Sequence, residues 1–412
     1  MRMSRQVQGM MMPEELVVGL AAWPLKVPAK RAVEISRVPV SPPTATPAEL
    51  TRAALEKPFG FESLRRALTP EDRVSIVLDP HVPHLAEILE TVLAYLKSAL
   101  IPPGLVTLLT TPESPTNWSS QLALEFAGVQ REVHDPADRK KLAYLASTQD
   151  GRRIYMNRTL VDADFTIVLT GRGYDPLAGY AGAEAGVFPA LGDEENRNAY
   201  LGQVSIEAPG EEPWHVRVEA EEVVRMLGLP FFVQVIEGAG DTVQGVVAGL
   251  LESSPEGVRA QDARWSGTVT EEPDTVIAAI SGDPERITFM DLAKAAICAA
   301  RFAPKGSRIA VLSAAAPALG EGAALLRAME TPVGAKRRLA KRMPADWSAC
   351  RLWAFVTKNY SVFLSSGYTD DVAEELFTTP LHNAAEVQRL IDSSEKVLLI
   401  PDAHKTLITM NV

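Results

Sequence analysis

The stretch "DFTIVLTG" at residues 164–171 runs almost directly into "PLAGYAGAEAGVFPA" at residues 176–190. The first stretch is mostly apolar and rich in β-branched residues, so it predicts a buried strand. The second is rich in glycine and alanine and carries a single charge, Glu184. Glycine suits positions where the backbone passes close to another group or takes a positive φ angle. A buried strand followed by such a loop is typical of an α/β sheet with a ligand-binding loop at its carboxyl edge.

Two further apolar strands are predicted earlier in the chain, at residues 73–79 and 104–111, with an amphipathic helix between them at 85–99. Alternation of strand and helix, with nearly continuous apolar strands, predicts a parallel sheet covered on both faces. Ligands bind beyond the carboxyl ends of such strands. We therefore expect the loops that follow these three strands to converge.

A second α/β alternation is predicted after the polar segment 253–274, which is typical of a domain boundary. Its predicted strands and helices lie at 275–281, 288–303, 308–314 and 318–329, and the runs 351–357, 361–366 and 396–402 complete it. The sequence therefore predicts two Rossmann-like α/β domains, 1–268 and 269–412, with mostly parallel sheets that face each other across a cleft. An opening hairpin is also predicted, from residues 15–21 and 32–38.

Composition narrows the class of protein. The chain has 412 residues, is 46% hydrophobic and carries a net charge of −11. An acidic chain argues against a nucleic-acid or anionic-membrane partner, and the basic run 336–342 is typical of a solvated helix face. No apolar run approaches the ~20 residues of a membrane-spanning helix, and the N-terminus lacks a signal-peptide pattern. Cys298 and Cys350 lie in apolar surroundings, which predicts buried, inert thiols. We expect a cytoplasmic protein, for which an oligomer is open.

Several motifs occur together in one order along the chain. They include "RVSIVLDPHVP" (73–83), "VTLLTTPESP" (106–115), "LAGYAGAEAGVFPA" (177–190) and "TVIAAISGDPERITFMDLAKAA" (275–296). In this order they resemble the N- and C-terminal domains of the nickel-pincer lactate racemase family. The resemblance implies hydride removal from the 2-carbon of a hydroxy acid, with return to either face. It also implies a nickel-pincer cofactor on a loop lysine, a histidine on the nickel, and two histidines and an arginine around the substrate.

The sequence departs from this family at the positions that would carry the chemistry. Ala185 stands where the resemblance places the cofactor-bearing lysine, and Val82 stands where it places the arginine. The positions that match the family's histidines are held by Tyr174-Asp175 and by the segment 112–115, and a third falls near Tyr200. We therefore expect no nickel-pincer cofactor and no bound metal.

The candidate binding residues are those that could still hold a small carboxylate. Lys294 matches the family's carboxylate-binding lysine, and Asp291 replaces a glutamine one turn earlier; at i, i+3 the two could instead pair with each other. Arg172, at the carboxyl end of its strand, is the best replacement anion binder. The full predicted set is Lys294, Asp291, Arg172, Asp175, Glu113, Ser114 and His81.

Other polar residues allow two interpretations. Asp175 and Glu184 flank the glycine-rich loop, and they either bind a cation or a basic ligand or are solvated carboxylates. His81 and His84 have metal-ligand spacing, but Pro83 disfavours a helix there and no third ligand lies nearby. The remaining histidines in polar contexts are expected at the surface: His215, His382 and His404.

Three functions are open from the sequence. The leading hypothesis is a lactate-racemase-like protein that binds a small 2-hydroxy acid or related carboxylate and is catalytically silent or repurposed. The alternatives are an active racemase or epimerase with altered site residues, and a non-catalytic partner subunit.

Overall fold

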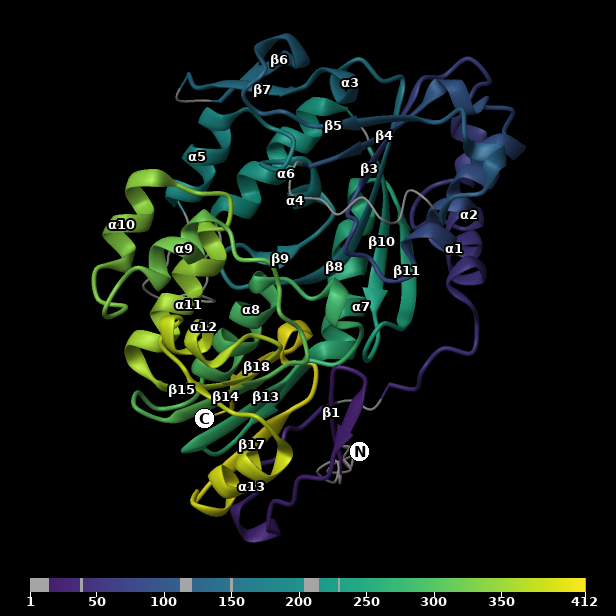
Figure 1. Cartoon of the computed structure of the whole chain (residues 1–412). Helices are drawn as coiled ribbons and strands as arrows, with labels where there is room; N and C mark the ends of the chain where they lie inside the picture. Colours follow the sequence, from purple (N-terminus) through teal and green to yellow (C-terminus); the bar gives the residue numbers. More distant parts are fainter. Residues whose placement is uncertain are drawn as a thin grey trace, which may run out of the picture.

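The computed structural model describes residues 15–37, 40–111, 121–148, 151–203, 215–228 and 230–411. It has the predicted α/β architecture, with one large sheet in each half of the molecule (Figure 1). No helix in this described part of the chain combines the length and the apolar character needed to cross a lipid bilayer.

The first sheet has seven strands in the order β11-β10-β8-β3-β4-β5, with β9 paired to β8. The strands are β3 (Val74–Leu78), β4 (Val106–Thr110), β5 (Gln130–Val133), β8 (Phe165–Asp175), β9 (Gly179–Ala181), β10 (Phe231–Glu237) and β11 (Val243–Gly249). From β10 to β5 the neighbouring strands are parallel, whereas β11 and β9 are antiparallel to their partners. The chain order reverses between β3 and β8, which makes this the topological switch point of the sheet.

Both faces of the first sheet are covered, as its continuous apolar strands predict. Ile76 of β3 packs in one core cluster with Leu89, while the neighbouring Val77 packs in another with Phe188. The elements around this sheet are α1 (Pro47–Glu56), α2 (Leu85–Ser98), α3 (Arg158–Val161), α4 (Glu184–Val187), α5 (Glu194–Gln203), α6 (His215–Leu227), α7 (Ser254–Trp265) and the hairpin β6 (Leu142–Ser147) and β7 (Arg153–Asn157).

The second sheet has five parallel strands in the order β16-β15-β14-β13-β17, so its switch point lies between β13 and β17. The strands are β13 (Thr275–Ala279), β14 (Arg308–Leu312), β15 (Ser361–Ser365), β16 (Thr379–Pro380) and β17 (Val397–Ile400). Its helices are α8 (Phe289–Ala300), α9 (Glu321–Arg327), α10 (Ala335–Arg342), α11 (Trp347–Asn359), α12 (Asp370–Glu375) and α13 (Ala384–Asp392). The apolar run 351–357 is part of helix α11, where Trp353 packs against Phe289 of α8 with ring centroids 5.4 Å apart.

The predicted opening hairpin is wrong in its second strand. β1 (Leu16–Val18) pairs with β2 (Ala21–Trp23) across a two-residue turn that begins at Gly19, whose φ is +58°. The segment 32–38 does not supply the partner strand. Ala32 forms an isolated bridge to Val397 instead.

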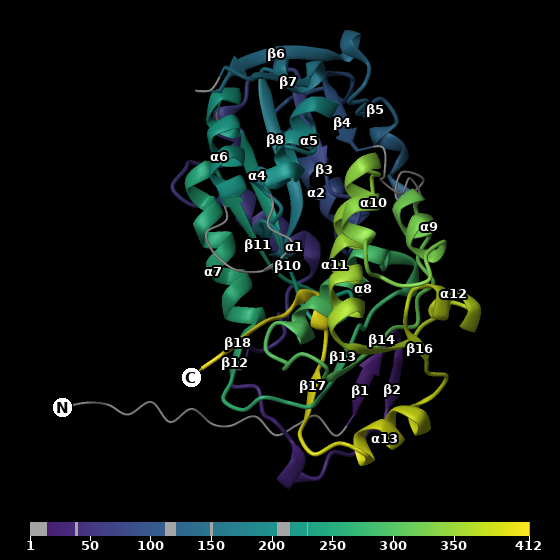
Figure 2. The same cartoon turned by 90° about the vertical axis from the view of Figure 1, so that its left-hand side faces the viewer.

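This first hairpin packs on the second sheet, beside β13 and β17 (Figure 2). Leu16 and Val18 share a core cluster with Ile277 of β13. The polar segment 253–274 contains α7 and the strand β12 (Ser266–Val269), which pairs with β18 (Leu407–Met410). The division at residue 268 stays a prediction, and the structure adds that the chain passes between the two halves more than once.

Both cysteines are buried and free, as predicted. Burial raises the pKa of the Cys298 thiol to about 11. Burial and the neighbouring Asp346 carboxylate raise the pKa of Cys350 as well. Both thiols are therefore protonated at neutral pH and unsuited to act as nucleophiles.

Candidate functional site

A polar cleft lies where the carboxyl ends of the two sheets meet. Its wall on the first sheet follows β3, β8 and β10, and its wall on the second follows β13, α8 and β17. The charged side chains and histidines that line it are His81, Arg172, Glu237, Asp241, Arg286, Asp291, Lys294, His404 and Lys405. Both topological switch points thus open on one cavity, which is where α/β sheets place their ligands.

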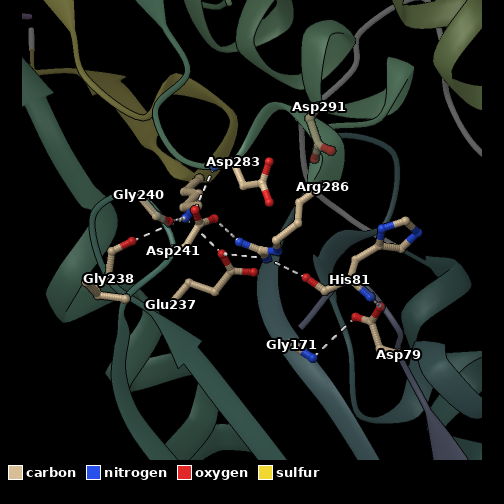
Figure 3. Close-up of polar contacts among 12 residues, drawn as sticks. Asp79, His81, Gly171, Glu237, Gly238, Gly240, Asp241, Asp283, Arg286 and Asp291 are labelled. Atoms are coloured by element: carbon tan, nitrogen blue, oxygen red, sulfur yellow. Dashed lines mark hydrogen bonds and ion pairs between the residues drawn. The ribbon is translucent and has the colours of Figure 1, made fainter. Parts of the chain in front are cut away.

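Ion pairs across this polar cleft use two of its cations (Figure 3). Arg286, from the second half, pairs with Asp241 and lies 3.7 Å from Glu237, and it donates to the carbonyl oxygen of His81. Lys405 Nζ lies 2.8 Å from Glu237 Oε2 and donates to the carbonyl oxygens of residues 238 and 240. Burial alone would raise the pKa of Glu237, but Lys405 and Arg286 hold it below its usual value. These groups therefore join the two halves of the molecule.

Lys294 also lines the polar cleft but, unlike Arg286 and Lys405, it is not held by an ion pair with another described residue. Among the residues that the structure describes, it forms no hydrogen bond or ion pair. Asp291, three residues earlier, accepts hydrogen bonds from the backbone N (2.9 Å) and Oγ1 (2.7 Å) of Thr288 and so caps helix α8. Burial would raise the pKa of Asp291, yet Lys294, His404 and the Thr288 bonds together lower it. Asp291 therefore belongs to the capping box at the start of α8, and the side chain of Lys294 lines the cleft without a hydrogen bond to it.

Arg172 is held by the protein itself. Its guanidinium donates to the carbonyl oxygens of Ala181 and Gly182 at 3.2 Å and to that of Ser254 at 3.0 Å. It also lies 3.4 Å from the carboxylate of Glu184, and both side chains are buried. Burial lowers the pKa of Arg172, and Glu184 opposes that shift. Of the two interpretations of Glu184, the solvated carboxylate is wrong, because Glu184 is buried against Arg172 of β8.

The glycine-rich loop requires glycine at position 182. Gly182 has a φ of +77°, and a Cβ atom there would lie 2.0 Å from the carbonyl oxygen of Gly171. The loop can therefore fold back against its own strand. The carboxylate of Asp175 accepts hydrogen bonds from the backbone N of Leu177 (2.8 Å) and of Ala178 (3.1 Å), and so stabilises the start of the loop.

A second cavity, here called the loop cavity, lies between this loop and the ends of β3 and β4. Its volume is about 300 Å³. The described residues that line it include Asp79, His81, Thr170, Asp175, Ala185 and Gly186, and none of the lining residues is a lysine or a cysteine. Asp79 is occupied by backbone donors, at 3.0 Å from the N of His81 and 3.3 Å from the N of Gly171. His81 lines both cavities and so connects them.

Several polar-cleft residues were not predicted from the sequence, namely Glu237, Asp241, Arg286, Lys405 and His404, and His404 was placed wrongly. It was expected at the surface, but it lies on a short 3-10 helix (Ala403–Lys405) that follows β17 and lines the polar cleft. Burial and the neighbouring Lys405 lower its pKa to about 4. Its Nδ1 atom is enclosed and has no hydrogen-bond partner among the described residues. Its place directly after a buried strand at a switch point is the signal that could have found it.

The remaining predicted residues lie elsewhere. Glu113 and Ser114 fall outside the described residues. His84 is exposed, lies 3.7 Å from Glu87 and lines neither cavity. Within the described part of the chain, no group of three histidine, cysteine, aspartate or glutamate side chains could hold a metal ion.

Comparison with known proteins agrees with this fold. Residues 19–204 match the model of the lactate racemase N-terminal domain. The N-terminal part of the chain is therefore similar to that domain, which supports lactate-racemase-like family membership. Its fold is similar to that of the lactate racemase apoprotein from Thermoanaerobacterium thermosaccharolyticum, with a TM-score of 0.78 and 15% identity over 96% of this chain and 99% of that one. A protein from Thermotoga maritima is similar with a TM-score of 0.68 and 12% identity, over 88% of this chain and 98% of that one. No curated protein matches the sequence.

The residues of the loop cavity do not fit a lysine-tethered pincer cofactor. Ala185, at the position of the tethering lysine, lines the cavity with a methyl group. Among the described residues that line the cavity, His81 is the one imidazole, and the carboxylates of Asp79 and Asp175 are bonded to backbone amides. This donor set lacks both the amine for the covalent bond and the paired imidazoles that the resemblance implies.

Proposed function

We propose that this chain binds a small 2-hydroxy acid, or a related carboxylate, in the polar cleft. We further propose that it does so without a tethered nickel cofactor and without racemising lactate. The observation that carries the proposal is the contrast among the cations of the polar cleft. Arg172, Arg286 and Lys405 are each bonded to protein groups, whereas Lys294 forms no hydrogen bond or ion pair among the described residues, and the nearby carboxylate of Asp291 is bonded to Thr288.

A carboxylate in the cleft would pair with the ammonium of Lys294. Charge-assisted hydrogen bonds of this type are shorter and stronger than neutral ones, and partial exclusion of water strengthens them further. The carboxylates of the cleft would repel an anion less than their number suggests. Glu237 and Asp241 are paired with cations, and Asp291 is bonded at the start of α8.

Racemisation needs groups on both faces of the reacting carbon. The loop side of the cleft supplies Arg172, whose guanidinium is bonded to Glu184 and to backbone oxygens. The position of the tethering lysine is Ala185. The structure thus supports ligand recognition on the second half of the molecule without the loop chemistry of the family.

Binding is tested by titration calorimetry with D- and L-lactate as probes. Lys294→Met should weaken binding about 10- to 100-fold, because a hydrogen bond to a charged group contributes about 1.5–3 kcal/mol. Lys305→Met, at an exposed lysine of the same half, is the matched control and should leave binding unchanged. Failure of both enantiomers to bind would overturn the proposal and favour a subunit that keeps the fold for assembly.

The cofactor part is tested on protein purified from cells that make the pincer cofactor. We expect the mass of the bare polypeptide, negligible nickel and no lactate racemisation. A mass increment on a peptide within residues 171–200, or stoichiometric nickel, would contradict the proposal and favour an active racemase.

A further inference from the structure

We propose that His404 gives the polar cleft its selectivity for carboxylates that carry an oxygen atom on the adjacent carbon. It does so by donating a hydrogen bond from a neutral imidazole to that oxygen. This inference rests on the proposed function, since it takes the carboxylate to be held by Lys294. It adds the group that would distinguish a 2-hydroxy or 2-oxo acid from a simple carboxylic acid.

The segment that carries His404 is fixed on both sides. Asp402 accepts hydrogen bonds from the Oγ (2.5 Å) and backbone N (3.4 Å) of Ser281, at the carboxyl end of β13. Lys405 is bonded to Glu237 across the cleft. A side chain held between two such anchors has little freedom to move, which is what a specificity group requires.

His404 and Lys294 lie on the same side of the polar cleft. Helix α8 packs directly against the segment Ala403–Lys405. The carboxylate of Asp291, on α8, interacts electrostatically with both Lys294 and His404. A single small ligand can therefore reach both side chains.

The imidazole is neutral at physiological pH. Four charged groups face it: Asp402 and Lys405 on its own segment, Asp291 on α8 and Glu237 on β10. Burial has the largest effect on its pKa and lowers it, Lys405 acts in the same direction, and the three carboxylates oppose them; the result is a pKa of about 4. A neutral ring carries one N–H donor and one acceptor nitrogen.

The surroundings of the ring decide which nitrogen holds the proton. Nδ1 is enclosed and has no partner among the described residues. A buried N–H without an acceptor is rarer in proteins than an under-used acceptor, so the proton is assigned to Nε2. Nε2 is not enclosed and likewise has no partner in the described part of the chain, so its N–H is available to a ligand in the cleft.

This donor suits an oxygen placed next to a carboxylate. A hydroxyl or a keto oxygen accepts the hydrogen bond from Nε2. A methylene group at the same position would cover the N–H without accepting a hydrogen bond from it. A net hydrogen bond of about 1 kcal/mol, together with the cost of an unpaired group, predicts a preference of about 10-fold.

The experiment compares lactate, pyruvate and propanoate, three acids with the same carbon skeleton, by titration calorimetry on the full chain. Wild type should bind lactate and pyruvate about 10-fold more tightly than propanoate. His404→Leu should bring the three affinities within about 2-fold of one another, with propanoate unchanged. His404→Gln keeps an N–H donor and should retain part of the preference.

The outcomes separate the two proposals. Binding of all three acids by wild type without preference, or a preference that survives in His404→Leu, overturns the role of His404 and leaves the binding function intact. Preference for lactate over both other acids overturns the donor assignment. No binding of any of the three overturns the proposed function and this inference together.

A spectroscopic measurement tests the ring without any ligand. Long-range ¹H–¹⁵N spectra at pH 7, assigned with His404→Gln, should show the Nε2–H tautomer for this residue. The Nδ1–H tautomer, or a charged ring at pH 7, would contradict the inference.

Discussion

The two walls of the polar cleft meet at one cavity, yet they differ in which side chains the fold leaves without a bond. On the loop side, Arg172 and Glu184 are buried against each other. On the opposite wall of the cleft, Lys294 and His404 have no hydrogen-bond partner among the described residues. Both walls lie at a switch point, so position alone does not make a charged residue a ligand group. What distinguishes Lys294 and His404 from Arg172, Arg286 and Lys405 is that no hydrogen bond or ion pair among the described residues satisfies them.

The largest expected effect is on the free energy of unfolding. It concerns the wall of the cleft that carries Arg172 and the glycine-rich loop, here called the loop wall. Arg172→Ala leaves Glu184 buried without its cation, and breaking a buried pair in this way costs about 3–5 kcal/mol of unfolding free energy. Lys294→Ala removes a cation that forms no hydrogen bond or ion pair and interacts only electrostatically with Asp291, so it should change the same free energy by no more than about 1 kcal/mol. Urea unfolding of the two variants measures the contrast.

The double variant Arg172→Met, Glu184→Leu sharpens the comparison. Removing both charges avoids the uncompensated carboxylate, so its loss of stability should be smaller than that of Arg172→Ala. A loss as large as that of the single variant would show that the hydrogen bonds of Arg172 to backbone oxygens matter more than the ion pair.

The next largest effect is the contribution of His404 to the pH dependence of the unfolding free energy. Its pKa is about 4 in the folded protein against 6.5 for the ordinary side chain, so the unfolded chain takes up the proton first as the pH falls. The stabilisation contributed by the neutral His404 is therefore fully present above about pH 6.5. It is lost progressively as the pH falls to about 4. The expected loss is on the order of 1–3 kcal/mol.

Unfolding of His404→Gln between pH 5 and 6.5 checks this slope, which should be shallower than that of wild type. His134 is also buried, and burial lowers its pKa too, so some slope should remain in the variant. An unchanged slope in His404→Gln would place the effect on His134 and contradict the neutral state assigned to His404.

A smaller effect is expected at the ion pairs that cross the cleft. Arg286→Ala removes the contacts with Asp241 and Glu237 and should cost about 1–2 kcal/mol, since the side chain is partly exposed. The control Arg327→Ala breaks an exposed pair with Glu375 and should cost less than about 0.5 kcal/mol. The cost at Arg286 should fall as salt is added, because screening weakens partly exposed pairs.

Much of this fold could be predicted from the sequence, because the patterns that define it are local. The strand expected at 73–79 is Val74–Leu78, and the helix expected at 85–99 is Leu85–Ser98. The run 351–357 shows where local pattern fails. Its apolar residues suit either a strand or a buried helix, and packing of Trp353 against α8 decides for the helix.

The site was harder to predict, since its character depends on pairings between distant parts of the chain. Lys294 was found through the family resemblance, and the structure places it in the polar cleft. Glu184 is buried because a residue twelve positions earlier in the chain, Arg172, meets it. The polar sequence around His404 gave no sign that β10 and α8 enclose it, because both lie more than one hundred residues away in the chain.

The smallest expected effect tests whether the loop wall can regain the family's chemistry one residue at a time. Ala185 is partly buried on the wall of a cavity of about 300 Å³, so Ala185→Lys has room for the longer side chain. The free energy of unfolding should change by less than about 1 kcal/mol. Gly182→Ala, in the same loop, should destabilise the protein far more, because its Cβ would meet the carbonyl oxygen of Gly171.

We expect Ala185→Lys to gain neither nickel nor lactate racemisation in cells that make the cofactor. A lysine supplies the amine for a covalent bond but not the paired imidazoles or the arginine, and Tyr174, Asp175 and Val82 remain at the corresponding positions. Racemisation by this single variant would show that the loop wall keeps a catalytic group that the polar contacts of the described residues do not reveal.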